Sequence, residues 1–158
     1  MLLRKDKEGV VAIPQPSHAW LSGQLARVWG NGDFAVPIPN EEVCLAAEQH
    51  DIGWLQWERR PALDPGTGLP QEFFRLQPKK HIAIWREGVA RACAFGRYPA
   101  LLVSLHAQTI YERHFDFDKA RPEDAASVRA FLAGRRRFQA KMAALLRDDP
   151  KTNREAAP

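Results

Sequence analysis

Four of the five histidines in the chain lie in segments with the apolar spacing of amphipathic helices. His18, His50, His81 and His106 each lie three or four positions from apolar residues of their own segment, which places them on predicted core-facing sides of four separate helices. Burying four imidazoles is costly unless they share a partner, and a metal ion held by neutral imidazole is the usual one. The pattern therefore predicts a metal site between helices.

An adjacent carboxylate strengthens this prediction. His50 and Asp51 end an apolar helical segment, and Gly53 follows in "HDIGW". Neighbouring residues of a regular helix point in different directions, so both can serve one site only if the helix ends or loosens there, which Gly53 permits. Imidazole and carboxylate together suit Fe, Mn or Zn as a divalent or trivalent ion. The predicted ligands are His18, His50, Asp51, His81 and His106, whereas His114 lacks the apolar register and is predicted to lie on the surface.

The elements that must position these side chains are mostly helical. Residues 2–13 have two β-prone ends around Asp6-Lys7-Glu8-Gly9 and predict a hairpin. Helices are predicted from a cap at Ser17 to about Trp29, from a cap at Asn40 to about His50, and over 78–95, 98–112 and 121–147. The predicted fold class is thus mostly α, a bundle of about five helices with a small N-terminal β-hairpin. The segment 58–78, with four prolines and two glycines, is a long loop of a kind that is often functional.

The 158 residues fit one domain, predicted over 1–147, followed by an apolar-poor tail, 148–158, expected to be mobile. A net charge of +4 is too small to predict a nucleic-acid partner, and no segment has the length and apolarity of a membrane span or the pattern of a signal peptide. Cys44 and Cys93 form no CxxC and are predicted to be buried free thiols, which favours the cytoplasm.

The order of the predicted ligands resembles a known superfamily. A lone His, an adjacent His-Asp and further His on later helices is similar to the HD-domain superfamily of all-helical, metal-dependent phosphohydrolases, which has an oxygenase branch with two irons. The segments "IPQPSHAWLSGQLARVWG", "AAEQHDIGWLQWERRPALDPGTGLP" and "PALLVSLHAQTIYERH" more closely resemble the HD-like bacterial domain-of-unknown-function family 3891, over nearly the whole chain. The resemblance implies that His18 is the first ligand, His50 and Asp51 the paired motif, and His81 and His106 the additional ligands of two-metal members, hence one or two ions.

The chain departs from the superfamily pattern at two points. Trp54 follows Gly53 where many HD phosphodiesterases have Lys or another polar residue, and the Asp usually supplied by a late helix has no clear counterpart after His106. Asp116, Asp118 and Asp124 are candidates by composition alone, and capping explains them equally well. Members of the resembling family continue beyond the point where this sequence ends, with an apolar helix that contains an Asp. The resemblance thus implies that the metal site of this chain is either incomplete or completed by another chain.

The leading functional hypothesis is hydrolysis of a small anionic phosphoester, with Asp51 as the catalytic residue that orients a metal-activated water. Two alternatives stay open: a di-iron oxygenase using the same ligands, and a non-catalytic structural or ligand-sensing module on the HD-like scaffold. A homo-oligomer is compatible with all three. The predicted substrate-binding residues are Arg59, Arg60, Lys80 and Trp54.

Overall fold

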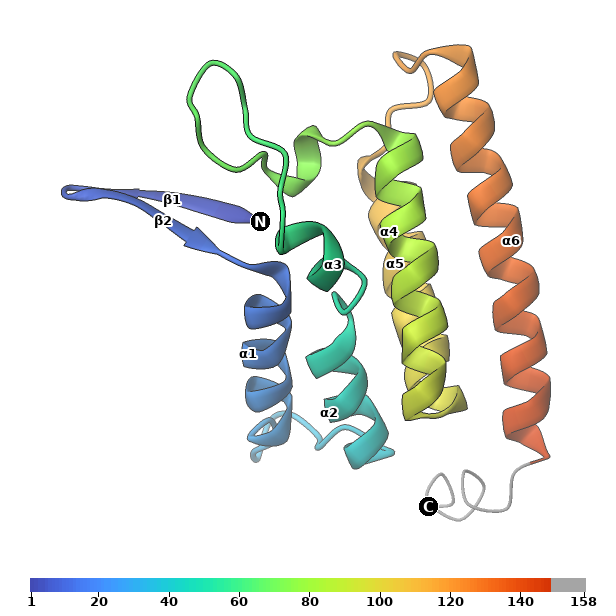
Figure 1. Ribbon diagram of the computed structural model, residues 1–158. Helices are drawn as coiled ribbons and strands as arrows, with labels where there is room; N and C mark the ends of the chain where they lie inside the picture. The colour runs from blue at the N-terminus through green and yellow to red at the C-terminus, as the bar shows by residue number, and fades with distance from the viewer. Residues whose placement is uncertain (149–158) are drawn as a thin grey trace.

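A computed structural model describes residues 1–148, and within them it has a two-stranded hairpin, six α-helices and two short 3-10 helices (Figure 1). The predicted mostly helical fold with an N-terminal hairpin is therefore confirmed; of the predicted tail, residues 149–158 lie outside the described part. The elements are β1 Leu2–Asp6, β2 Gly9–Ile13, α1 Gln15–Arg27, α2 Asn40–Gln49, α3 Trp54–Glu58, η1 Phe73–Arg75, α4 Pro78–Ala92, η2 Cys93–Phe95, α5 Arg97–His114 and α6 Pro122–Arg147.

The hairpin forms as predicted. Strands β1 and β2 pair antiparallel, with Leu2 opposite Ile13 and Asp6 opposite Gly9. Gly9 has a φ of 154°, in the region that side chains other than glycine rarely adopt, so this glycine closes the turn. The hairpin then leads through Pro14 directly into α1.

Prolines begin three of the helices, and the start of α4 at Pro78 is as predicted. Pro16, Pro78 and Pro122 each occupy a first-turn position, where a missing N–H costs nothing and the fixed φ suits the helix. Ser17 lies inside α1, and Asn40 is the first residue of α2 rather than its cap. The two predicted caps were therefore wrong, and α1 begins three residues earlier than expected, with Pro14 in the cap position.

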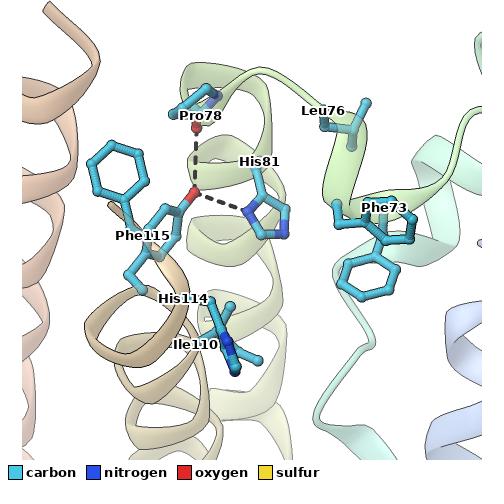
Figure 2. Close-up of a pocket in the computed structure, with 9 residues that line it drawn as sticks. Phe73, Leu76, Pro78, His81, Ile110, His114 and Phe115 are labelled. Atoms are coloured by element: carbon cyan, nitrogen blue, oxygen red, sulfur yellow. Dashed lines mark hydrogen bonds between the residues drawn. The ribbon is translucent and has the colours of Figure 1, made fainter. Parts of the chain in front are cut away.

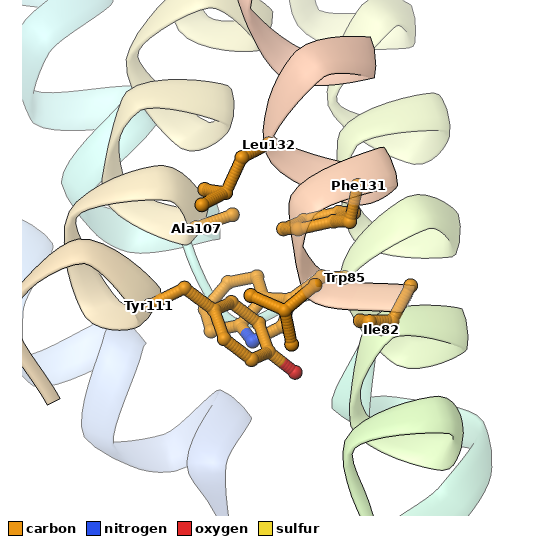
Figure 3. Close-up of a cluster of buried hydrophobic side chains, with 7 residues drawn as sticks. Ile82, Trp85, Ala107, Tyr111, Phe131 and Leu132 are labelled. Carbon is orange, nitrogen blue, oxygen red and sulfur yellow. The ribbon is translucent and has the colours of Figure 1, made fainter. Parts of the chain in front are cut away.

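Helices α4, α5 and α6 enclose the largest cluster of buried apolar side chains (Figure 3). On α6, Val128, Phe131 and Leu132 are buried as predicted. Leu145 was expected on the same face but is 38% exposed, whereas Leu146 is buried. Fourteen residues separate Leu132 from Leu146, close to four full turns, so Leu146 continues the buried stripe.

Helices α1 and α2 lie side by side at one edge of the bundle, and α2 packs in turn on α5 (Figure 1). Cys44 on α2 is a buried free thiol as predicted, but Cys93 is exposed, because the chain leaves α4 there and enters η2. Among the described helices, none has the length and apolar character needed to cross a membrane.

Candidate metal centre

Three of the five predicted ligands meet between α1 and the end of α2. One potential ligand atom from each of His18, His50 and Asp51 lies within 4.8 Å of the other two. His18 is in the first turn of α1, and its ring meets the His50 ring edge to face with centroids 5.3 Å apart. Residues 32 positions apart in the chain thus bring two imidazoles and a carboxylate to one place.

The end of α2 gives His50 and Asp51 their common direction. Regular helix ends at Gln49, and the following amides bond three residues back: Ile52 N to Gln49 O at 3.0 Å and Trp54 N to Asp51 O at 3.0 Å. In this tight turn His50 Nε2 lies 3.3 Å from Asp51 Oδ2. The expectation that the helix ends at the His-Asp pair is confirmed.

The His50 ring is oriented by a hydrogen bond to a backbone carbonyl, as the rings of metal-binding histidines commonly are. Its Nδ1 lies 2.7 Å from the carbonyl oxygen of Ala47, to which it donates, so Nε2 carries the free lone pair and faces Asp51. Burial alone would lower the pKa of His50, but the hydrogen bond and charge of Asp51, with the Ala47 carbonyl, raise it. The Nε2 lone pair therefore points at a place that attracts positive charge.

The spacing of these atoms fits a small metal ion. Two ligand atoms that each lie about 2.1 Å from an ion are about 3.0 Å apart at right angles and about 3.4 Å apart at the tetrahedral angle. The 3.3 Å between His50 Nε2 and Asp51 Oδ2 falls in this range. The remaining separations are all within 4.8 Å, so binding an ion would need them to contract by at most about 1.4 Å.

Asp51 adds an energetic argument for a cation. It is only 3% exposed, and in residues 1–148 the charged partner of its carboxylate is His50 alone. A buried carboxylate is costly unless hydrogen bonds and opposite charge satisfy it fully. A metal ion between His18, His50 and Asp51 would supply that charge.

His106 on α5 lies against the same group. The ring centroid of His106 is 4.7 Å from that of His50. In the described part of the chain, no hydrogen bond to the His106 ring is found. Burial, followed by the neighbouring His50, lowers the pKa of His106 to about 4, so the imidazole is neutral at physiological pH. A neutral imidazole beside the three-residue group is suited to act as a further ligand, and its predicted role stays a prediction.

His81 on α4 is placed differently, because both of its nitrogens are already bonded. Trp85 Nε1, which can only donate, lies 3.1 Å from His81 Nε2, so the proton of the neutral ring is on Nδ1. Nδ1 then donates to the hydroxyl of Tyr111 at 2.9 Å, and this hydroxyl points at the Pro78 carbonyl 3.5 Å away. For His81 to bind a metal, Nε2 would have to exchange its Trp85 hydrogen bond for the ion.

The hydrogen bond between His81 and Tyr111 was not predicted from the sequence. Both residues line a cavity that is separate from the group formed by His18, His50 and Asp51 (Figure 2). This cavity of about 590 Å³ is largely apolar and includes His114, which is exposed as predicted. A second cavity, of about 240 Å³, adjoins the group of His18, His50 and Asp51, which we call the metal group. His50 and His106 line this cavity together with four apolar residues of α2 and α5.

The neutral histidines make the metal-free protein less stable in acid. Burial lowers the pKa of His81 and His106 from 6.5 to about 4, so between these values the unfolded chain binds protons that the folded chain does not. His50, with its raised pKa, acts in the opposite direction. We expect the urea midpoint to fall as the pH is lowered from about 6.5 to about 4, and to fall less in His106→Gln. A midpoint that is constant or rises over this range would contradict the assignment.

Gly53 serves a purpose other than the one predicted. Its φ of −63° is open to any residue, so conformational freedom is not what requires glycine. A Cβ at this position would overlap the Ile84 carbonyl oxygen and lie 2.8 Å from the Gly88 nitrogen and 2.9 Å from its Cα. Gly53 therefore allows the His-Asp turn to pack directly on the backbone of α4.

The predicted substrate-binding residues differ in their exposure to solvent. Arg59 and Arg60 are exposed where α3 ends, and Lys80 is exposed on α4 with its Nζ 5.6 Å from the centre of the Trp57 ring. Trp54 is only 1% exposed and packs on His81 and Trp57, so its ring offers no face to a substrate in this arrangement.

Two of the three late aspartates, Asp116 and Asp124, have partners close to them in the chain. Asp116 Oδ1 accepts from the amides of Asp118 and Lys119 at 3.1 and 3.2 Å, and Asp124 pairs with Arg121 at 2.8 Å. Within residues 1–148, the group of ligand-type side chains close enough to share an ion is His18, His50 and Asp51, so none of these three aspartates joins it.

No curated protein and no solved structure gives a significant match to this chain. One family model does match, over residues 1–157, and its description is "Protein of unknown function (DUF3891)". The quoted segments around His18, His50 and His106 lie within that range. The chain therefore belongs to the DUF3891 family.

Proposed function

We propose that this protein is a metal-dependent phosphohydrolase that acts on a small anionic phosphoester. The observation that supports this most strongly is the convergence of His18, His50 and Asp51, with ligand atoms within 4.8 Å of one another. The donor set of two imidazoles and a carboxylate suits Fe, Mn or Zn. We include His106 as a further ligand because its neutral ring adjoins that of His50.

An ion bound there would lower the pKa of a water and polarise a phosphoryl oxygen. The protein supplies the surroundings. Asp51, held by the turn after α2, orients the water through its second carboxylate oxygen. The cavity beside His50 and His106, with Val43, Ala47 and Leu102 in its wall, places a largely apolar surface next to the reacting group. Arg59, Arg60 and Lys80 contribute positive charge near α3 and α4 that attracts an anionic substrate.

The two free thiols of the protein, Cys44 and Cys93, favour a reducing compartment, and we place the protein in the cytoplasm.

The test is turnover of bis(p-nitrophenyl) phosphate and p-nitrophenyl phosphate by protein loaded with Mn²⁺, Fe²⁺ or Zn²⁺, under air and under nitrogen. We expect hydrolysis with at least one metal that does not depend on oxygen and is lost in Asp51→Asn. His114→Ala serves as the control, because this imidazole is exposed and lies outside the metal group. Hydrolysis that survives in Asp51→Asn, or no hydrolysis with any metal, would overturn the proposal, and metal binding without hydrolysis would favour the oxygenase or the non-catalytic module.

A further inference from the structure

The outer side of α1 exposes large apolar side chains that the sequence predicted to be buried. Leu21 and Leu25 share the helix face of His18 and were expected in the core, but they are 52% and 56% exposed. Trp20 beside them is 56% exposed. Helix α1 lies at the edge of the bundle and packs mainly on α2, with fewer contacts to α3, and these side chains stay exposed in the described chain (Figure 1).

The loop after α1 extends this surface. Leu21, Leu25 and Val28 follow one another at i, i+4 and i+7 and so form one stripe, and Val28 is 78% exposed. Trp29 continues the stripe and contacts the Phe34 ring at 5.7 Å. We call the exposed side chains of residues 20–38 the α1 apolar surface. Those in the loop are Val28, Trp29, Phe34, Val36 and Ile38.

This surface is concentrated and nearly free of charge. Eight of the sixteen exposed large apolar residues in the described chain fall within these 19 residues. The segment contains two charged residues, Arg27 and Asp33, and Arg27 is already paired with Glu48 of α2 at 2.5 Å. Because this surface has almost no free charge, it has little means of attracting or selecting a charged protein of another kind. An equally apolar surface is the better partner.

We propose that the α1 apolar surface is the interface of a homodimer, in which α1 of one copy packs on α1 of a second copy across a twofold axis. Three aromatic and five aliphatic side chains, each more than half exposed, leave on the order of 800 Å² of apolar surface, about what one partner buries in a stable complex. Homodimer interfaces are the most apolar class, and a twofold axis places the same stripe on both sides.

The dimer would also shield the metal group. His18 lies one turn before Leu21 on the same face of α1, so a second copy seated on Leu21 and Leu25 would close the His18 side of the group. The interface itself stands whether or not a metal binds.

Sedimentation velocity from about 1 μM to about 100 μM tests the interface. The wild-type chain is expected to sediment as a dimer at the upper end of this range. Leu25→Glu and Val28→Lys place a charge in the interface and should each raise the dimer dissociation constant by at least about tenfold. Both residues are exposed in the single chain, so circular dichroism should stay unchanged.

Leu145→Glu is the matched control, since Leu145 is an exposed leucine on a helix that lies outside the α1 apolar surface. It should dimerise as the wild type does. A wild-type chain that stays monomeric at about 100 μM would overturn the proposal and leave the surface to a different partner. A dimer that persists in both variants, or that the Leu145→Glu control also loses, would overturn it too.

Discussion

Replacing Gly53 with alanine should destabilise the fold by about 3 kcal/mol, the upper end of the usual range for overpacking. The added Cβ would overlap the Ile84 carbonyl oxygen and approach the Gly88 nitrogen to 2.8 Å. Both obstacles are backbone atoms of α4, which cannot rotate away as a side chain could, so the turn carrying His50 and Asp51 would have to separate from α4. Urea unfolding of the metal-free protein measures the effect.

Gly134→Ala is the control for this experiment. Gly134 lies inside α6, and a Cβ there would meet nothing within 4 Å. Because alanine is the better helix former, we expect Gly134→Ala to stabilise the protein by about 0.5–1 kcal/mol. If Gly53→Ala unfolded at the same urea concentration as the wild type, the close packing of the His-Asp turn on α4 would be wrong.

Replacing Asp51 with asparagine should weaken metal binding by at least about a hundredfold. Asparagine keeps the shape of the side chain but removes the negative charge that a buried cation needs, and Asp51 is the carboxylate of the three-residue group. Titration calorimetry with Mn²⁺ and Zn²⁺ measures the affinity. Circular dichroism should stay close to that of the wild type.

Asp118→Asn provides the matched control, because Asp118 is an exposed carboxylate in the turn between α5 and α6. Its affinity for metal should equal that of the wild type. Equal affinity in Asp51→Asn and the wild type would mean that the His50–Asp51 contact is a structural ion pair and that the metal, if bound, is bound elsewhere.

Local sequence signals predicted most of the fold. Proline and glycine positions and the helical spacing of apolar residues indicated the hairpin and the five long helices, with ends correct to within about three residues. The errors came from competition between signals. Pro14 and Pro16 begin α1 ahead of the better side-chain cap Ser17, and the short helix α3 is too brief to show periodicity.

The candidate site was predictable only in part, because spacing tells which face a residue occupies but not what that face meets. The convergence of His18, His50 and Asp51 followed from a shared core-facing pattern. The same reasoning misplaced Leu21 and Leu25, because the buried residues of α1 are Gln15, Ala19 and Gly23, which lie on a different face of the helix from these two leucines.

His81 shows a second limit of the sequence. Its inward direction was predictable, but its bonding to Trp85 and Tyr111 depends on how α4 and α5 pack together. The role of Gly53 was equally hidden, because the need for glycine arises from the backbone of Ile84 and Gly88, which lie 31 and 35 residues later in the chain.

Elemental analysis by mass spectrometry tests the central claim most directly. Protein purified without added metal should contain about one or two equivalents of Fe, Mn or Zn, and His18→Ala and His50→Ala should each contain far less while keeping the helical circular dichroism spectrum. Metal absent from the wild type even after reconstitution, or metal retained in both variants, would contradict a metal centre formed by His18, His50 and Asp51.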